Sequence, residues 1–448
     1  MAAVFRRKVL DCLRVWKDTE KGRSAALLEG AKGVGKTTVA IQFGRTEYDS
    51  YILIDFSSVT DDIRDLFGSF SNDLDEFFMR LEVVSGKRLV ERNSLVVFDE
   101  VQRYPKARQM IKRLVADGRY DYLETGSSIS ARANVRSILI PSEEHAIPMG
   151  PMDFEEFMWA SGSEDYADYI RRCYDSRVPL GSGIHESVMR MFGTYMVVGG
   201  MPKVVEKFLS DRSLSGIETA KRSIIDGYRN DIAGLPISVS ERVSELFDSI
   251  PSLLSGGKRV ISPAKIAKGR RMRDYRRAIE WLSEAKIVNF CKCQTEPSVF
   301  SCSGTDESRM KPYLLDTGLL ISVAFEDDKR AMAAVFNGFL GGKMSTGGGM
   351  FFENVVAQEL VSRGYRLVFS EFDVGDSTKR YSVDFLILDG GKVVPIEVKA
   401  SVSSRHAALD RFCGKYRSIV ENPIVVHPKD LRFDGTCLYV PAYMVFVL

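Results

Sequence analysis

The stretch GAKGVGKT, residues 30–37, decides how the first third of the chain folds. It satisfies the pattern G-x-x-x-x-G-K-[ST], whose glycines let the backbone wrap around phosphate groups with its N–H groups pointing inward. Lys36 places a positive charge beside the β- and γ-phosphates, Thr37 offers a hydroxyl ligand for Mg²⁺, and the following helix directs its positive end at the anion. We therefore expect ATP and Mg²⁺ to bind here. The expected contacts are Gly30, Lys32, Gly33, Val34, Gly35, Lys36, Thr37 and Thr38.

The sequence around this loop predicts a parallel sheet. Strand candidates at 25–29, 51–56, 95–98 and 120–125 alternate with helical segments, and the run at 95–98 is apolar at every position. Strands that are apolar at every position are typical of a parallel sheet covered by helices on both faces. The last third of the chain returns to mixed helices and strands, so the expected fold class is α/β with several domains.

Two acids follow the apolar run LVVF at 95–98. An acid at the carboxyl end of a buried strand predicts a second carboxylate on the magnesium side of the site, and this role falls to Asp99. Glu100 stands where a general base orients water toward the γ-phosphate. A small-molecule kinase excludes water and has no use for such an acid, so Glu100 favours an ATPase. The alternative is a strand that simply ends in two solvated acids.

The strand expected at 120–125 leads into Thr125-Gly126-Ser127-Ser128. A polar side chain at this tip can hold the attacking water or contact the γ-phosphate, and we assign this role to Ser127, with Thr125 as second candidate. An ordinary loop hydroxyl is the alternative. No arginine finger can be selected from the candidates Arg103, Arg108, Arg113, Arg132 and Arg136.

Charged residues also interrupt apolar strands near the end of the chain. Glu397 and Lys399 point to the same face of a strand because its side-chain period is two. Asp384 begins the neighbouring strand, across a hairpin turn at 389–391. This pattern can bind one or two divalent cations, with the lysine assisting water or steadying phosphate charge, and Glu353 on a helix at 351–364 could add a ligand. The alternative is an internal salt bridge between Lys399 and one acid.

Residues 240–295 show the order helix, short helix, helix, strand, which is the order of a winged helix-turn-helix. The segment 265–277 is dense in lysine and arginine against the single acid Asp274. Such density in and before a recognition helix predicts contacts with DNA phosphates. The alternatives are a solvated helix face or a docking surface. The expected DNA contacts are Lys265, Lys268, Arg270, Arg271, Arg273, Arg276 and Arg277.

The motifs GAKGVGKTT, VFDEVQRYP, TGSS, GGMPKVV, YLLDTGLL, FFENVVAQEL and VDFLI…PIEVKA together resemble a prokaryotic family of AAA-type ATPases. That family carries a C-terminal domain of unknown function with a PD-(D/E)xK nuclease-like fold. The resemblance covers nearly the whole chain. It implies an ATPase core at 1–160, a helical lid at 161–235, a winged helix at 236–300 and a nuclease-like domain at 301–448.

The resemblance also implies roles for single residues. Nucleotide and magnesium binding would fall to Lys36 and Thr37, and the second acidic motif would be Asp99 and Glu100. The nuclease-type constellation would be Glu353, Asp384, Glu397 and Lys399. The chain departs from the family at Glu124, where an apolar residue is usual, and at Ser382, where a glutamate is common. It also lacks the glycine–arginine pair expected within 138–151, which leaves the arginine finger unassigned.

Composition narrows the remaining choices. A net charge of +2 gives no global attraction to nucleic acid, so any contact must come from a local patch. Seven scattered cysteines predict a reducing, cytoplasmic setting. No run approaches the ~20 apolar residues of a membrane helix. The sequence leaves open whether the chain forms a homo-oligomer.

Two functional hypotheses follow. The first is an ATP-hydrolysing enzyme that acts on or with DNA and whose C-terminal domain is a metal-dependent nuclease. The second is an ATP-controlled DNA-binding regulator or scaffold whose nuclease-like domain is catalytically inactive.

Overall fold

The computed structural model describes residues 4–126, 144–297, 305–343, 349–374, 380–401 and 406–448. The chain forms two compact units. The first comprises Met1–Gly150 with Glu284–Lys286, and the second comprises Pro151–Ser283 with Ile287–Leu448. Among the described residues, no helix has both the length and the apolar character needed to cross a lipid bilayer.

The first unit contains the predicted parallel sheet. Its strands are β1 (Ala25–Glu29), β2 (Ser50–Asp55), β3 (Ser94–Asp99), β4 (Asp121–Gly126) and β5 (Glu144–Pro148). They lie in the order β2-β3-β4-β1-β5, and every neighbouring pair is parallel. This five-stranded arrangement is typical of the AAA-type P-loop fold.

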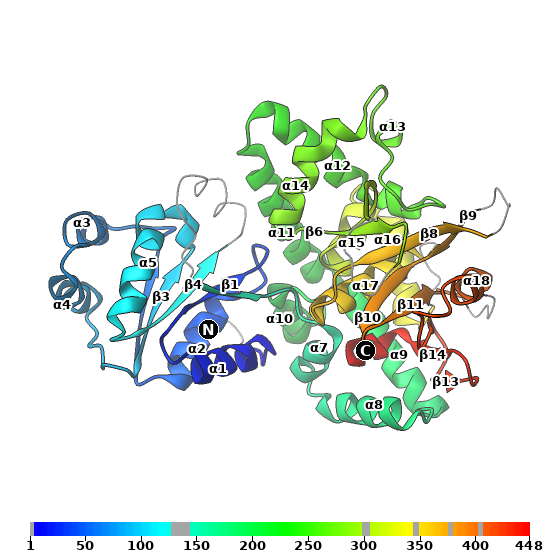
Figure 1. Ribbon diagram of the computed structural model, residues 1–448, viewed down its shortest axis with the longest axis horizontal. Helices are drawn as coiled ribbons and strands as arrows, with labels where there is room; N and C mark the ends of the chain where they lie inside the picture. The colour runs from blue at the N-terminus through cyan, green and yellow to red at the C-terminus, as the bar shows by residue number, and fades with distance from the viewer. Residues whose placement is uncertain (1–3, 127–143, 298–304, 344–348, 375–379, 402–405) are drawn as a thin grey trace. The chain divides into compact units, whose positions relative to one another are not determined.

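Helices cover both faces of this sheet, as Figure 1 shows. On one side lie α1 (Val9–Glu20) and α2 (Lys36–Glu47), and on the other lie α3 (Asp61–Ser69), α4 (Leu74–Ser85) and α5 (Pro105–Asp117), which follows the short helix η1 (Val101–Arg103). Sequence signals set these helix ends. Asp73 caps α4 by accepting hydrogen bonds from the first-turn amides, Pro105 occupies the first turn of α5, and Gly86 and Gly118 end the two helices with positive φ angles of 66° and 71°.

The parallel register brings the carboxyl ends of the central strands to one edge of the sheet. Glu29 at the end of β1 is level with Gly126 at the end of β4, and β3 pairs with β4 up to Phe98 and Glu124. The phosphate-binding loop and the acids that follow β3 therefore lie at the same edge.

The second unit opens with helices. These are α7 (Phe154–Ala160), α8 (Glu164–Ser176), α9 (Ser182–Val198), α10 (Pro202–Asp211), α11 (Leu214–Ala233) and α12 (Ile237–Ser255). Gly199 and Gly200 lie between the end of α9 and the start of α10. A Cβ on Gly200 would lie 1.9 Å from the carbonyl oxygen of Met152, so only glycine permits this close approach.

Next come α13 (Pro263–Ile266), η2 (Met272–Tyr275), α14 (Arg276–Glu284), and strands β6 (Val288–Gln294) and β7 (Thr305–Leu314). Strand β6 pairs antiparallel with β7 but parallel with β8 (Val368–Asp373), in a sheet of order β7-β6-β8-β9 that ends with β9 (Arg380–Val383). The expected domain boundary at residue 300 therefore falls between two paired strands. Helices α15 (Thr317–Ala324), α16 (Lys329–Leu340) and α17 (Met350–Ser362) follow β7.

The last sheet has the order β10-β11-β12-β14-β13. It consists of β10 (Phe385–Asp389), β11 (Lys392–Val398), β12 (Ile424–His427), β13 (Arg432–Phe433) and β14 (Leu438–Pro441), with helices α18 (Ala407–Lys415) and η3 (Ala442–Val447). The antiparallel pairing of β10 with β11 confirms the predicted hairpin, whose turn contains Gly390 and Gly391 at φ angles of 53° and 79°.

Candidate functional site

The phosphate-binding loop joins β1 to α2. Gly33 and Gly35 have φ angles of 89° and 98°, in the left-handed region where a side chain is disfavoured, and Gly35 directly precedes the first residue of α2. Lys32 and Thr38 are exposed, whereas Val34 is buried. The loop thus presents the start of a helix at the edge of the sheet where the strands end, as the sequence pattern predicts.

Two contacts hold the loop in place from outside the motif. A Cβ on Gly30 would lie 2.0 Å from the carbonyl oxygen of Met149, so the loop base packs directly against the backbone that follows β5. The buried guanidinium of Arg7 donates to the carbonyl oxygens of Val34 at 2.9 Å and Gly150 at 2.8 Å. Nothing in the sequence predicts this role for Arg7, because its partners are 27 and 143 residues away in the chain.

Lys36 is folded back onto the loop. Its side chain is buried, and its Nζ donates to the carbonyl oxygens of Gly30 at 2.9 Å and Ala31 at 3.0 Å. Burial lowers the pKa of Lys36, while the charges of Glu100 and Asp99 act in the opposite direction. The ammonium group therefore lies within the loop, and rotation of the side chain can bring it to phosphate oxygens.

Asp99 links the loop to β4. The hydroxyl of Thr37 lies 2.9 and 3.0 Å from the two carboxylate oxygens of Asp99, and the hydroxyl of Thr125 also donates to this carboxylate. Asp99 is 5% exposed and Thr125 is fully buried. The structure thus brings together one residue from the P-loop and one from each of two neighbouring strands.

Glu100 has an unusual backbone conformation, with φ 54° and ψ 43°. Placing a residue with a side chain in this left-handed region costs about 1 kcal/mol. Strained backbone conformations of this kind are found mainly at functional sites. Its amide donates to the hydroxyl of Thr125 at 3.1 Å, and its carboxylate accepts from Gln102 at 2.8 Å. These contacts hold the Glu100 side chain partly exposed beside Asp99. Nothing in the sequence predicts this contact of Gln102 with Glu100.

The arginine candidates separate into two groups. Arg108 forms a buried ion pair with Glu144 at 2.6 Å. Arg113 donates to backbone carbonyl oxygens in the loop that precedes α4. Both side chains therefore stabilise the fold. Arg103 lies 3.8 Å from the carboxylate of Glu100 and is exposed. Ser127, Arg132 and Arg136 lie outside the described residues.

In the second unit, Lys311 joins two of the predicted acids. Its Nζ, carried by β7, lies 3.0 Å from Glu353 of α17 and 3.2 Å from Asp384, which sits between β9 and β10. The other carboxylate oxygen of Asp384 accepts from the amide of Val398 at 2.9 Å. Lys311 was not among the predicted residues, because a single lysine in a strand gives no sign of partners 42 and 73 positions away.

We call Glu353, Asp384 and Glu397 the carboxylate cluster. The remaining predicted residues at this cluster are also ion-paired. Lys399 donates to Glu397 at 2.6 Å, and Arg259, together with the hydroxyl of Tyr313, contacts Glu353. Burial, and then the charge of Asp384, raises the pKa of Glu397 to about 7. Within the described part of the chain, no three His, Cys, Asp or Glu side chains converge closely enough to hold a metal ion.

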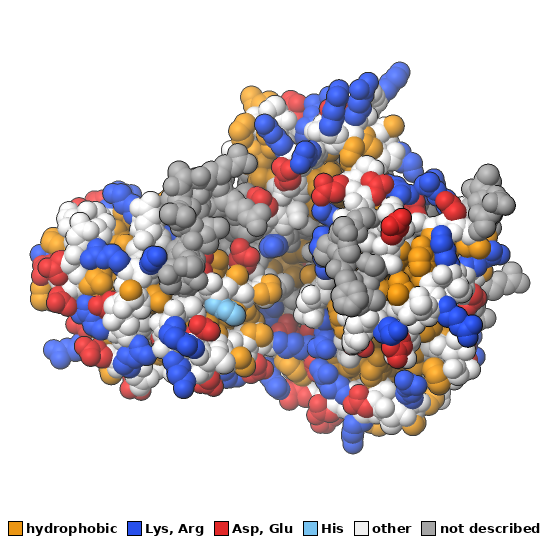
Figure 2. All heavy atoms as spheres, viewed as in Figure 1, with side chains coloured by type: hydrophobic (Ala, Val, Ile, Leu, Met, Phe, Trp, Pro, Cys, Tyr) orange, Lys and Arg blue, Asp and Glu red, His pale blue; other side chains and the backbone are white. Residues whose placement is uncertain are grey.

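The basic segment is largely exposed. All of its predicted contacts are exposed except Arg270, which is partly buried and lies 3.9 Å from Glu245. Helix α14 begins only at Arg276, so most of these side chains precede it, in α13, η2 and the turns between them. Figure 2 shows blue side chains gathered over this region, where α13 lies in Figure 1.

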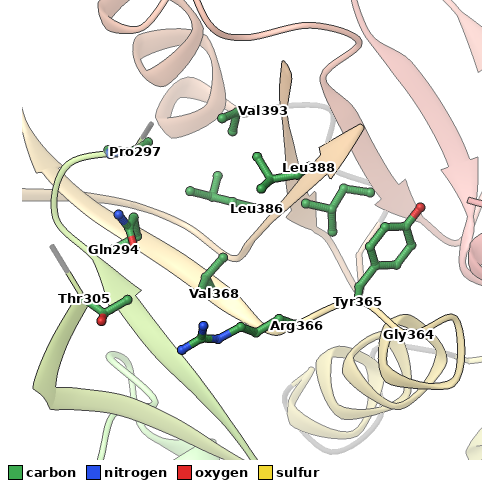
Figure 3. A pocket seen from close by; sticks show the side chains of 11 residues that line it. Gln294, Pro297, Thr305, Gly364, Tyr365, Arg366, Val368, Leu386, Leu388 and Val393 are labelled. Carbon is green, nitrogen blue, oxygen red and sulfur yellow. The ribbon is translucent and has the colours of Figure 1, made fainter. Parts of the chain in front are cut away.

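A separate cavity of about 200 Å³ lies between β6, β8 and the β10–β11 hairpin. Its walls are mainly apolar and include Val368, Leu386 and Leu388, with Gln294 and Arg366 as polar residues at its edge (Figure 3). None of the described site residues predicted from the sequence lines it.

Comparison with known protein families gives three matches. Residues 22–158 match the family described as "AAA domain". The first unit therefore contains an AAA-type P-loop ATPase domain. Residues 189–330 and 348–443 match two families that are each described as a domain of unknown function, DUF8612 and DUF4143. No curated protein matches the chain.

Several solved structures are distantly similar. The ORC1 protein of Aeropyrum pernix in complex with DNA is 16% identical, covering 73% of this chain and 94% of its own, at a TM-score of 0.30. Cdc6p from Pyrobaculum aerophilum is 14% identical, covering 75% and 97%, at 0.32. AMPPCP-bound DnaA from Aquifex aeolicus is 12% identical, covering 64% and 90%, at 0.29.

Proposed function

We propose that this chain is an ATPase that hydrolyses ATP with Mg²⁺ and acts with DNA. The observation that carries the ATPase half is the chain of contacts from Thr37 through Asp99 to Thr125, with Glu100 held beside it. Hydroxyl and carboxylate oxygens are the ligands Mg²⁺ prefers, so Thr37 and Asp99 fit the ion. When bound, the ion would neutralise charge on the phosphates.

The protein's own groups supply the rest of the reaction. Lys36 exchanges its two carbonyl partners for phosphate oxygens, which compensates the loss of both hydrogen bonds. Glu100 accepts a hydrogen bond from the attacking water and orients it toward the γ-phosphate, while Gln102 fixes the position of this carboxylate. Ser127 remains the predicted contact for the γ-phosphate or the water.

The proposal that the protein acts with DNA is based on the exposed basic segment, residues 265–277. The order of α12, α13 and α14 followed by strand β6 supports a winged helix at 236–300. Phosphate contacts would come from its exposed lysines and arginines. The same proposal includes an ATPase core at 1–160, a helical lid at 161–235 and a nuclease-like domain at 301–448.

DNA binding by this segment is testable with a matched pair of variants. Arg273→Ala/Arg276→Ala should weaken binding of a fluorescent DNA duplex and reduce the salt dependence of the affinity. Lys329→Ala/Arg330→Ala removes two exposed charges of the second unit outside the segment and should leave binding unchanged. Equal effects of the two variants would show that the segment has no special role.

For the C-terminal part, the contacts favour the regulator over the nuclease. All three acids of the carboxylate cluster have a cationic partner within the protein. As arranged, these residues do not fit a divalent ion, so no cleavage step is derived. Metal-dependent cleavage remains a prediction from sequence. DNA cutting by the wild type with Mg²⁺ or Mn²⁺ that disappears in Asp384→Ala and Lys399→Ala would reinstate the nuclease.

A further inference from the structure

Lys311 occupies a position in the carboxylate cluster that nothing in its own sequence neighbourhood explains. The side chain is 3% exposed, and its ammonium group is 3.0 Å from one oxygen of Glu353 and 3.2 Å from one oxygen of Asp384. The ring centroid of Phe369 lies 5.1 Å from Nζ. A buried ammonium is tolerated only when paired, and here both partners are carboxylates.

When its three acids are ionised, the charges of the described cluster balance without an added ion. The acids are Glu353, Asp384 and Glu397, and the cations paired with them are Arg259, Lys311 and Lys399. Glu353 is fully buried, and Glu397 is 6% exposed. A divalent ion added to this arrangement would leave two uncompensated positive charges in a low-dielectric site. Such a site disfavours the ion unless a resident cation leaves.

We infer that the Lys311 ammonium is the resident cation of this cluster and takes the position that a divalent metal ion would otherwise hold between Glu353 and Asp384. The wild type therefore does not bind a divalent ion at these acids, and loss of Lys311 opens a site for one. Hard cations such as Mn²⁺ match an all-oxygen site of this kind.

Calorimetric titration of the nucleotide-free full chain with MnCl₂ tests the inference. All samples carry Asp99→Asn, which removes the carboxylate expected to hold Mg²⁺ at the nucleotide site. The protein with native Lys311 should show no binding. Lys311→Met should bind one Mn²⁺ per chain, and Lys311→Met/Asp384→Asn should lose that binding. Mn²⁺ binding in the presence of Lys311 that Asp384→Asn abolishes would overturn the inference, as would absence of binding in Lys311→Met.

Thermal unfolding covers the case in which Lys311→Met folds poorly, because this substitution removes a cationic partner from both Glu353 and Asp384. Mn²⁺ binds the folded state, so it should raise the Tm of Lys311→Met and leave that of the Lys311 protein unchanged. Lys311→Met/Glu353→Gln keeps the charge balance but removes one ligand, and its response to Mn²⁺ should be much smaller. Failure of Mn²⁺ to stabilise Lys311→Met contradicts the inference. The outcome is independent of ATP hydrolysis.

Discussion

Thr125 offers the sharpest test of how the nucleotide site is built. Its single hydroxyl donates to the buried carboxylate of Asp99 and accepts from the amide of Glu100 at 3.1 Å. Thr125→Val keeps the shape of the side chain and removes both contacts. A hydrogen bond to a charged group contributes about 1.5–3 kcal/mol, and an amide left unpaired costs about 1–3 kcal/mol. Because both contacts share one hydroxyl, the losses do not simply add, and we expect about 3 kcal/mol in total.

Hydrogen exchange measured by mass spectrometry on the full chain reads this loss locally. An opening free energy lowered by about 3 kcal/mol corresponds to exchange about 100-fold faster in the peptides that cover β3 and β4. Thr125→Ser keeps the hydroxyl and is the control, with a much smaller effect expected. ATP turnover should fall with Thr125→Val and survive with Thr125→Ser. Unchanged exchange in Thr125→Val would refute the proposed role of this hydroxyl.

Further predictions concern the surroundings of this site. Gly30→Ala places a Cβ 2.0 Å from the carbonyl oxygen of Met149 and should cost about 1–3 kcal/mol in unfolding free energy, whereas Gly68→Ala, which meets no atom within 4 Å, should cost nothing in the same denaturation assay. Arg7→Met removes the hydrogen bonds to the carbonyl oxygens of Val34 in the loop and of Gly150, and it should weaken ATP binding about tenfold by calorimetry; unchanged affinity would show that the loop holds its shape alone. Burial, and then the charge of Glu144, raises the pKa of Glu124 well above its ordinary value. The folded state keeps a proton that the unfolded chain loses above its ordinary pKa, so this contribution to stability is complete at low pH and declines as pH rises. Glu124→Gln should flatten the fall in Tm that begins as pH rises above the ordinary pKa of glutamate, and an unaltered pH profile would contradict the burial argument.

The parallel sheet could be predicted because its signal is local. Strands β1 and β3 are largely apolar and lead directly into the P-loop and the acids of the site, so short windows around Gly35 and Asp99 were sufficient. The β10–β11 hairpin was predictable for the same reason, since its turn residues directly separate the paired strands.

Contacts between distant segments left no comparable trace. In the sequence, Lys311 cannot be distinguished from other polar residues of a strand. Only the fold places α17 and the β9–β10 junction next to it. The pairing of β6 with β8 likewise joins Lys292 to Val368 across a stretch of chain that appeared to contain a domain boundary. Alternation of side chains fixes which face a residue occupies, but it does not identify the partner on that face.

The central claim is that water, oriented by Glu100, attacks ATP bound at the P-loop. Phosphate release by wild type and Glu100→Gln, measured with Mg²⁺ in the presence and absence of DNA and alongside ATP binding, tests it directly. We predict that the wild type releases phosphate without any added acceptor and faster with DNA. Glu100→Gln should bind ATP as tightly as the wild type but release phosphate at least about 100-fold more slowly. Turnover by Glu100→Gln at the wild-type rate, or phosphate transfer that requires an acceptor, would contradict the account.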